Sequence, residues 1–330
     1  MRKKIENNMI EKNNLIPCCL CGKNDFVLLF SGHDYLGFSP LTFKVMKCNQ
    51  CGLVCLNPYP ENLIKYYDAY HKSFLEKDIF LLPWLLPDRI KKIKKIKTPG
   101  KILDIGCGVG IFLLDMQKEG WDVYGCDIYP DSCNIAKNMN GLKNIYNEDV
   151  LSLNLSENYF DVITLWHVLE HLTKPQDTLK KINKLLKDDG ILIIESPDFS
   201  SIQSKFFKSK WFPLELPRHI YQFSPNTVKK LLNSVNFEIL RKDYVVNPRI
   251  NFVDLKQSLL RYLGINKYLT EEEPKKKISV EEDFHKTSVT RNFFRYIFNY
   301  FCLIISLFLA LIHCEDSFRV YCKKLAKKER

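Results

Sequence analysis

Three features are missing from this sequence, and their absence narrows the class of protein. Residues 1–14 are charged and polar, without the apolar stretch of a signal peptide. The twelve cysteines are too irregularly spaced, in a chain of 330 residues, to form a disulfide framework. No internal repeat is visible. We therefore expect reduced thiols and a cytoplasmic location rather than a secreted, disulfide-bonded protein.

An apolar run well above the minimum length of a membrane-spanning helix is also missing. Residues 296–312 are nearly all apolar, but they are at the lower edge of the length that spans a bilayer. A strand-like segment at 318–323 must return to the globular domain soon afterwards. We therefore expect a buried or interface-lying helix, paired with Phe252–Tyr262. Peripheral association with the inner membrane surface through 296–312, near a lipid-linked acceptor, stays open.

The charge is unbalanced, because 49 lysines and arginines face 38 acidic residues and give a net charge of +11. Such a charge suits nucleic acid or an anionic membrane surface. Much of it lies in local runs that fit solvated helix faces, at 91–97, 275–277 and 323–330. The cysteine-containing segment 17–57 holds no basic–aromatic module typical of RNA binding, so a small-molecule acceptor is favoured over nucleic acid. The oligomeric state is not predicted.

Between residues 101 and 197 short apolar strands alternate with helical stretches, which predicts parallel strands joined by crossover helices. The predicted fold is α/β, with a doubly wound sheet of seven mostly parallel strands. Its strands are expected at 102–106, 123–128, 144–149, 161–166, 191–196, 237–246 and 318–323. Four parts follow: a leader and zinc-ribbon-like module at 1–58, a helical linker at 59–99, a core at 100–247 plus 316–323, and a helical insertion or cap at 248–315.

The stretch ILDIGCGVG ends a strand and opens a helix, with glycines that allow close ligand approach at 106, 108 and 110. Dinucleotide enzymes use a similar loop. However, Asp104 suits a pyrophosphate poorly and suits a ligand that carries an ammonium and a sulfonium. Asp127 ends the next strand, where a carboxylate can accept hydrogen bonds from both ribose hydroxyls.

These motifs resemble those of the class I S-adenosylmethionine-dependent methyltransferases. ILDIGCGVG is similar to motif I, YGCDI to motif II, and FDVITLWHVLEHL with LKDDGILIIESPD to the later motifs, over roughly 100–247. FRVYCKK resembles the last, antiparallel strand of that family. The resemblance implies S-adenosylmethionine as cofactor, with its methionine part held by Asp104, Gly106, Gly108 and Gly110. It further implies that Asp127 holds the ribose, Ile128 and Val150 flank the adenine, and Asp149 meets the adenine amino group.

The segment from His167 to His171 has the HxxEH spelling of a zinc peptidase, but it begins at a strand tip and Pro175 follows at once. It resembles instead the ExxEH segment of quinone-type O-methyltransferases, whose acidic residues and histidine hold a divalent metal. His167 replaces the first glutamate here, which makes magnesium doubtful, because magnesium prefers oxygen ligands. Alternatively, Glu170 and His171 only begin a helix.

Two histidines are candidates for the base that takes a proton from an acceptor hydroxyl. His167 follows the fourth strand, where ligands bind in such sheets. His219 lies in KWFPLELPRHIYQFSP, which resembles the W…P.H…F segment of many small-molecule methyltransferases and is expected to form a lid. The alternative for His219 is packing on Trp211 or Phe223.

Two Cys-x2-Cys pairs, Cys18 with Cys21 and Cys48 with Cys51, each end in Cys-Gly. This spacing predicts a structural zinc held by four thiolates, with no open coordination position. Redox or free thiols remain the alternative. The ribbon resembles those of sugar methyltransferases more than those of RNA methyltransferases.

The sequence therefore predicts methyl transfer to a hydroxyl of a sugar, lipid-linked or quinone-like small molecule. An RNA methyltransferase and a non-catalytic cofactor-binding scaffold are the alternatives.

Overall fold

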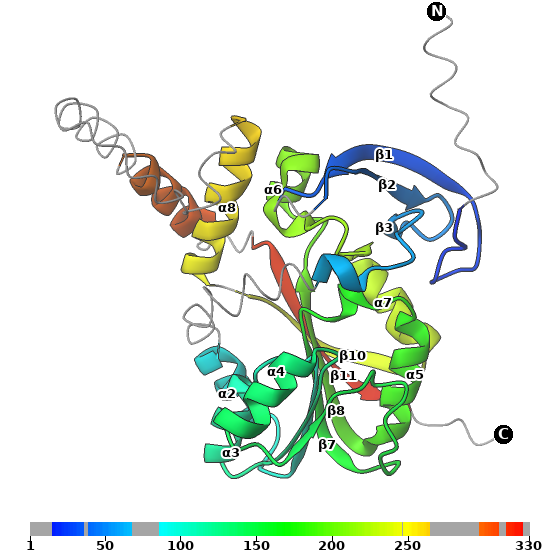
Figure 1. Cartoon of the computed structure of the whole chain (residues 1–330), viewed down its shortest axis with the longest axis vertical. Helices are drawn as coiled ribbons and strands as arrows, with labels where there is room; N and C mark the ends of the chain where they lie inside the picture. The colour runs from blue at the N-terminus through cyan, green and yellow to red at the C-terminus, as the bar shows by residue number, and fades with distance from the viewer. Residues whose placement is uncertain are drawn as a thin grey trace, which may run out of the picture.

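The chain forms two sheets, and the last strand of the smaller sheet comes from the part of the sequence that otherwise builds the larger one. The computed structural model describes residues 15–35, 39–67, 86–245, 247–264, 297–309 and 315–325. A small four-stranded sheet near the N-terminus lies above a seven-stranded sheet in Figure 1. This strand, β9, lies within the predicted core 100–247 but pairs with β3 of the small sheet. The small sheet therefore includes a strand from outside the predicted zinc-ribbon-like module.

The large sheet has the strand order β10-β11-β8-β7-β4-β5-β6. Its central pairs are parallel, whereas β11 runs antiparallel to both β8 and β10. This confirms the predicted seven-stranded, mostly parallel sheet. The strands are β4 Lys101–Ile105, β5 Asp122–Cys126, β6 Asn144–Tyr146, β7 Phe160–Trp166, β8 Leu186–Pro197, β10 Phe237–Tyr244 and β11 Ser317–Lys324. The third strand is shorter than predicted, and β8 begins five residues earlier.

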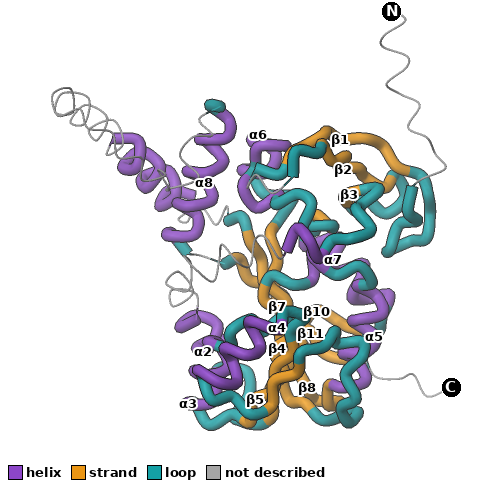
Figure 2. Tube along the Cα trace, viewed as in Figure 1, coloured by secondary structure: helices purple, strands orange, loops and turns teal. Residues whose placement is uncertain are grey.

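Alternate residues of the strands face two separate cores, as the period of a strand requires. Ile102, Val162 and Ile193 belong to one buried cluster, and their neighbours Leu103, Ile163 and Ile194 belong to another. Figure 2 shows the strands between two groups of helices. The first cluster is covered by α2 Leu86–Lys94, α3 Ile111–Lys118 and α4 Pro130–Asn134, which continues into the π-turn Ile135–Met139. The second is covered by α5 Pro175–Leu185 and α7 Pro225–Ser234.

Local sequence explains where these helices begin. Ser224 caps α7 through a reciprocal hydrogen-bond pair with Thr227, and Pro225 occupies the first turn, where its missing N–H costs nothing. In α2 Ile93 is fully buried, and Ile90 and Ile96, which follows the helix, pack against the same cluster. Of the predicted helical region 59–99, residues 68–85 lie outside the described residues.

The small sheet has the order β1-β2-β3-β9 and is antiparallel throughout. Its strands are β1 Phe26–His33, β2 Thr42–Cys48, β3 Val54–Leu56 and β9 Tyr221–Gln222. Strand β9 was not predicted. Two residues are too few for a sequence pattern to reveal, and pairing with a strand that lies far away in the sequence leaves no local signal.

The helical insertion predicted at 248–315 is described in part. The helix α8, Pro248–Tyr262, packs against a second helix at 297–309, because Phe252 and Leu255 share a buried cluster with Phe298, Cys302 and Ile305. The predicted pairing of these segments is therefore confirmed for the described residues. Among the described helices, none is both long and apolar enough to cross a membrane. The remaining helical segments of the described residues are 64–67, α6 Ile202–Phe207 and the short 3-10 turns Leu169–His171, Lys208–Lys210 and Phe212–Leu214.

We expect Phe318→Ala to destabilise the protein by about 3–5 kcal/mol, because a large side chain is removed from a tightly packed core. Phe318 is fully buried on β11, the strand inserted between β8 and β10. Leu240→Ala is the matched control on β10, where the side chain is 51% exposed, and it should cost about 0.5 kcal/mol or less. Urea unfolding followed by circular dichroism measures both, and equal losses would contradict this account of the core.

Candidate active site

The glycine loop follows β4 and brings the backbone close to two other segments. Gly106, Gly108 and Gly110 all have positive φ, at 70°, 52° and 78°. The N–H groups of Gly106 and Cys107 both donate to the carbonyl of Cys126 at the end of β5, over 2.8 and 3.1 Å. A Cβ on Gly106 would lie 2.5 Å from a methyl carbon of Val168. The loop thus touches the end of β5 and the residue after His167, and only glycine permits that approach.

Two predicted cofactor acids stand near the carboxyl ends of neighbouring parallel strands. Asp104 is 3% exposed, and its carboxylate accepts a hydrogen bond of 2.6 Å from the Thr164 hydroxyl. Burial raises the pKa of Asp104 to about 7, although the Thr164 hydrogen bond opposes that rise. Asp127 accepts the N–H of Gly108 over 2.8 Å and that of Tyr129 over 2.9 Å. A cation bound beside Asp104 would therefore favour its ionised form.

The three residues predicted around the adenine differ in exposure. The side chain of Ile128 is 46% exposed, and Asp149 is exposed as well. Asp149 also accepts the N–H of Leu151 over 2.8 Å. Val150 is only 3% exposed and packs in the core beneath the sheet. Ile128 and Asp149 are thus accessible to a ligand, and the role of Val150 stays a prediction.

His167 lies directly beyond β7 with a left-handed backbone, φ 56°. Its Nε2 is 3.2 Å from Oε1 of Glu195, and its Nδ1 is 3.5 Å from Oε1 of Glu170. Burial alone would lower the pKa of His167, but the two carboxylates outweigh it and raise the pKa to about 9. His167 is therefore an imidazolium at neutral pH. This protonation state does not favour the predicted role of His167 as a proton acceptor.

Glu195 is fully buried on β8 and also binds two arginines that sequence analysis missed. Arg89 of α2 donates to Oε1 over 2.6 Å, and Arg319 of β11 donates to Oε2 over 2.8 Å from Nε. Arg89 also stacks on Trp166, 4.5 Å from the ring centroid. Arg89 precedes the sheet in the sequence and Arg319 lies on its last strand, so no local sequence motif could have revealed that both bind Glu195. They keep the pKa of Glu195 well below its usual range, against the effect of burial.

His171 and His219 face each other, with ring centroids 4.6 Å apart. Nδ1 of His219 lies 2.7 Å from the carbonyl oxygen of Pro213, and Nδ1 of His171 lies 3.0 Å from that of Arg218. A carbonyl only accepts, so each Nδ1 carries a proton when these bonds form. Nε2 of His219 lies 3.8 Å from Oε2 of Glu215. Burial and the neighbouring His219 lower the pKa of His171 to about 4. His219 thus meets His171 rather than serving only as packing for Trp211 or Phe223.

Tyr67 connects this histidine pair to the cofactor side of the site. Its hydroxyl lies 2.8 Å from Nδ1 of His171 and donates to the carbonyl of Arg218 over 2.7 Å. Its ring packs on Tyr129, 6.1 Å between centroids, and Tyr129 is the residue whose N–H binds Asp127. The predicted ribose acid and the histidine pair are therefore parts of one continuous site.

The residues Glu170, His171 and His219 could hold a metal ion, since one ligand atom of each lies within 4.8 Å of the others. One carboxylate and two imidazoles suit zinc or iron better than magnesium. The doubt about magnesium that the sequence raised therefore remains. The HxxEH spelling does not form a peptidase site, because His171 ends a 3-10 turn, Leu169–His171, rather than lying within a long helix.

The four predicted zinc ligands meet at one point. Their sulfur atoms all lie within 4.8 Å of one another, with Sγ–Sγ distances of 3.5 Å between Cys18 and Cys51 and 3.6 Å between Cys21 and Cys48. A tetrahedral zinc with bonds of about 2.3 Å places its sulfurs about 3.8 Å apart, whereas a disulfide needs about 2.0 Å. The cluster therefore fits a structural zinc, as predicted.

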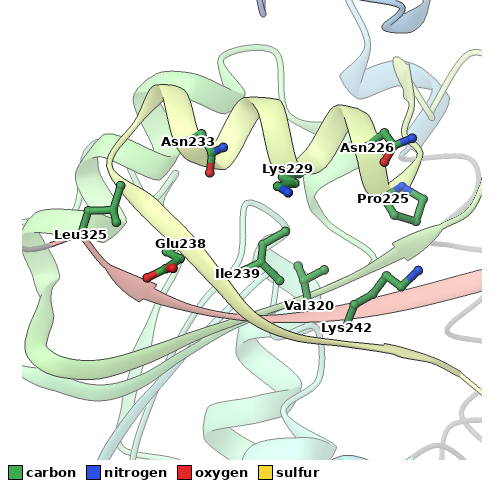
Figure 3. Close-up of a pocket in the computed structure, with 9 residues that line it drawn as sticks. All are labelled: Pro225, Asn226, Lys229, Asn233, Glu238, Ile239, Lys242, Val320 and Leu325. Carbon is green, nitrogen blue, oxygen red and sulfur yellow. The ribbon is translucent and has the colours of Figure 1, made fainter.

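A separate hollow lies between α7 and the strands β10 and β11, as Figure 3 shows. Its volume is about 620 Å³, and its lining includes Lys229, Lys242 and Glu238. None of the predicted cofactor, catalytic or zinc residues lines it. We assign no function to this hollow.

The fold defines a doubly wound domain, and domains of this kind bind nucleotide-like ligands at the carboxyl edge of the sheet. Residues 81–242 match the family model described as a methyltransferase domain. The chain thus contains a methyltransferase domain of the S-adenosylmethionine-dependent class, which confirms the resemblance found in the sequence.

Known proteins similar to this chain agree with that class. The ubiquinone biosynthesis O-methyltransferase of Coxiella burnetii is 30% identical over 145 residues, which are 42% of this chain and 59% of that protein. Its namesake from Haemophilus ducreyi is 35% identical over 105 residues, 29% of this chain and 44% of that protein. The chain thus spans about half the length of the curated relatives it matches.

A solved structure shares the fold at much lower identity. It is a chain in the complex between a methyltransferase activator and a candidate methyltransferase from Haloferax volcanii. It is 10% identical, with a TM-score of 0.51, and the match covers 82% of this chain and 99% of that chain.

We expect Asp127→Asn to weaken the binding of S-adenosylhomocysteine at least tenfold, because a carboxylate that would hold the ribose loses its charge. Titration calorimetry measures the affinity. Asp122→Asn is the matched control at the opposite end of β5, where the carboxylate pairs with Lys101. Wild-type affinity in Asp127→Asn would refute this placement of the ribose.

Proposed function

We propose that the protein transfers a methyl group from S-adenosylmethionine to a hydroxyl of a small, quinone-like acceptor. The observation that carries this proposal is the continuity of the cofactor acids with the imidazoles of His171 and His219, through Tyr67 and Tyr129. The similarity to O-methyltransferases of ubiquinone biosynthesis supports an aromatic hydroxyl in particular. A sugar or lipid-linked acceptor has no comparable support.

In this proposal the protein aligns the reactants and removes one proton. The cofactor, when bound, supplies an already activated methyl group, so alignment is the main contribution of the chain. Nε2 of His219 accepts the hydroxyl proton, because its Nδ1 is held at the Pro213 carbonyl. His167 stays protonated between Glu170 and Glu195 and offers positive charge near the developing oxyanion.

The proposed base can be tested with a labelled methyl donor. Cell extract incubated with the protein and labelled S-adenosylmethionine should gain label in its small-molecule fraction. His219→Gln should lower that rate at least a hundredfold, because the hydroxyl loses its proton acceptor, while affinity for S-adenosylhomocysteine changes less than twofold. His33→Gln, an exposed histidine on β1, is the matched control.

Other outcomes would overturn parts of this scheme. Label in the RNA fraction would support the RNA methyltransferase alternative, and cofactor binding without any labelled product would support a scaffold. Loss of rate in His167→Gln with full rate in His219→Gln would reassign the base.

We also propose that the protein works in the cytoplasm and attaches to the inner membrane surface through residues 296–312. The described part, 297–309, has no charged residue, yet Tyr300 is 67% exposed, Phe301 52% and Phe308 58%. Apolar side chains gathered in this way mark an interaction surface. The net charge of +11 favours an anionic surface. Residues 296 and 310–312 lie outside the described residues.

Vesicle flotation tests this attachment. The protein should float with vesicles of phosphatidylcholine and phosphatidylglycerol at low salt. Replacing both Tyr300 and Phe308 by serine should lower binding at least tenfold, since each aromatic side chain buries apolar area worth about 1.5–3 kcal/mol. Met139→Ser, at a side chain 79% exposed on another helix, is the matched control. Failure of the wild-type protein to float would refute the attachment.

A further inference from the structure

The zinc-ribbon module, here residues 15–35 and 39–58, shares a sheet with the segment that carries His219. Strand β3 pairs with β9, so that Val54 faces Gln222 and Cys55 faces Tyr221. The N–H of Leu56 donates to the carbonyl of Ile220 over 2.7 Å. We call residues 216–223 the acceptor wall. Its backbone is thus part of the ribbon sheet, one residue away from His219.

A buried ion pair joins the same two parts. Asp34, at the end of β1, lies 3.4 Å from a guanidinium nitrogen of Arg218, and both side chains are at most 1% exposed. Gly32 also packs closely, since a Cβ there would lie 2.7 Å from a methyl carbon of Leu216. A third contact reaches a zinc-ligand turn directly, because Lys230 of α7 donates to the carbonyl of Cys51 over 2.7 Å.

The other side of the acceptor wall is bound to the candidate active site. The N–H of Ile220 donates to the carbonyl of Glu170 over 2.9 Å. The carbonyl of Arg218 lies 3.0 Å from Nδ1 of His171 and accepts the hydroxyl of Tyr67. Arg218 thus binds the ribbon through its side chain and the active site through its backbone. Any shift of the ribbon has to move these contacts.

The ribbon has little core of its own, because its buried residues on β2 and β3 pack in clusters shared with the rest of the chain. Most residues of β1 are exposed or half-buried, and β3 has only three residues. Small modules of this kind need a metal or a disulfide for stability, and zinc binding supplies their folding free energy. Its sulfur geometry fits zinc.

We propose that the zinc-ribbon module is the support of the acceptor site, with Asp34 acting as a positioning residue through Arg218. Zinc would then control where His219, Glu170 and His171 lie, while the cofactor loop after β4 remains independent of it. Loss of zinc would produce a protein that still binds the methyl donor but no longer holds an acceptor. The assignment of this site to an acceptor rests on the proposed function, but the coupling itself does not.

Hydrogen exchange of the full chain tests the coupling without a known acceptor. After zinc is removed with a chelator and its loss is verified by elemental analysis, amides at 216–223 should exchange at least tenfold faster. Amides at 101–128 should keep their rates, and affinity for S-adenosylhomocysteine should change less than twofold. Asp34→Asn should speed exchange at 216–223 in the same way with zinc still bound.

Two further variants separate positioning from general stability. Asp34→Glu keeps the charge and should restore slow exchange at 216–223. Asp25→Asn is the matched control, an acid of the ribbon whose carboxylate accepts from Asn49 and Gln50. In protein labelled with ¹³C-histidine, Asp34→Asn should shift the imidazole signals of His171 and His219, whereas Asp25→Asn should leave them in place.

Several results would overturn the proposal. Unchanged exchange at 216–223 after zinc loss would do so, and so would unchanged exchange in Asp34→Asn. Faster exchange at 101–128 together with weaker cofactor binding would show that zinc stabilises the whole chain rather than one wall. Failure to find a methylated product would count against the proposed function and would leave these exchange rates unaffected.

Discussion

The carboxylate of Glu195 holds the main parts of the domain together through ion pairs. It is fully buried, and a buried charge is tolerated only when it is paired and hydrogen-bonded. Three cations meet it: Arg89 from the helix before the sheet, Arg319 from the last strand, and His167 from the tip of β7. Removing the Glu195 carboxylate would leave the buried guanidinium groups of Arg89 and Arg319 without their shared counter-charge, which is strongly destabilising. One side chain thus fixes the relative positions of α2, β11 and the site.

The same network gives two histidines, four residues apart in the sequence, opposite properties. His167 lies between two carboxylates, and its pKa rises to about 9. His171 is buried beside another imidazole, and its pKa falls to about 4. Near neutral pH the site therefore holds a fixed cation and a neutral ring within one turn of chain. Sites that separate the pKa values of neighbouring groups in this way can assign them different roles.

Much of the fold was predictable because its signals are local. The glycines at 106, 108 and 110 and the alternation of strands and helices appear in the sequence, as do the cysteine spacings. The site was less predictable because its contacts are distant in sequence. Asp34 and Arg218 are separated by 184 residues, and Glu195 and Arg319 by 124. No periodicity reports such pairs, and the two-residue strand β9 is too short to produce a pattern.

The left-handed backbone of His167 is another property that cannot be predicted from the sequence, since only contacts with its neighbours hold the residue in that conformation.

The ion pairs around Glu195 form in an order that depends on the synthesis of the chain. A growing chain presents Arg89 first, Glu195 106 residues later, and Arg319 a further 124 residues later. During synthesis the carboxylate first has a single arginine available to it. The core strands therefore cannot reach their final electrostatic balance until β11 has emerged and inserted between its two neighbours.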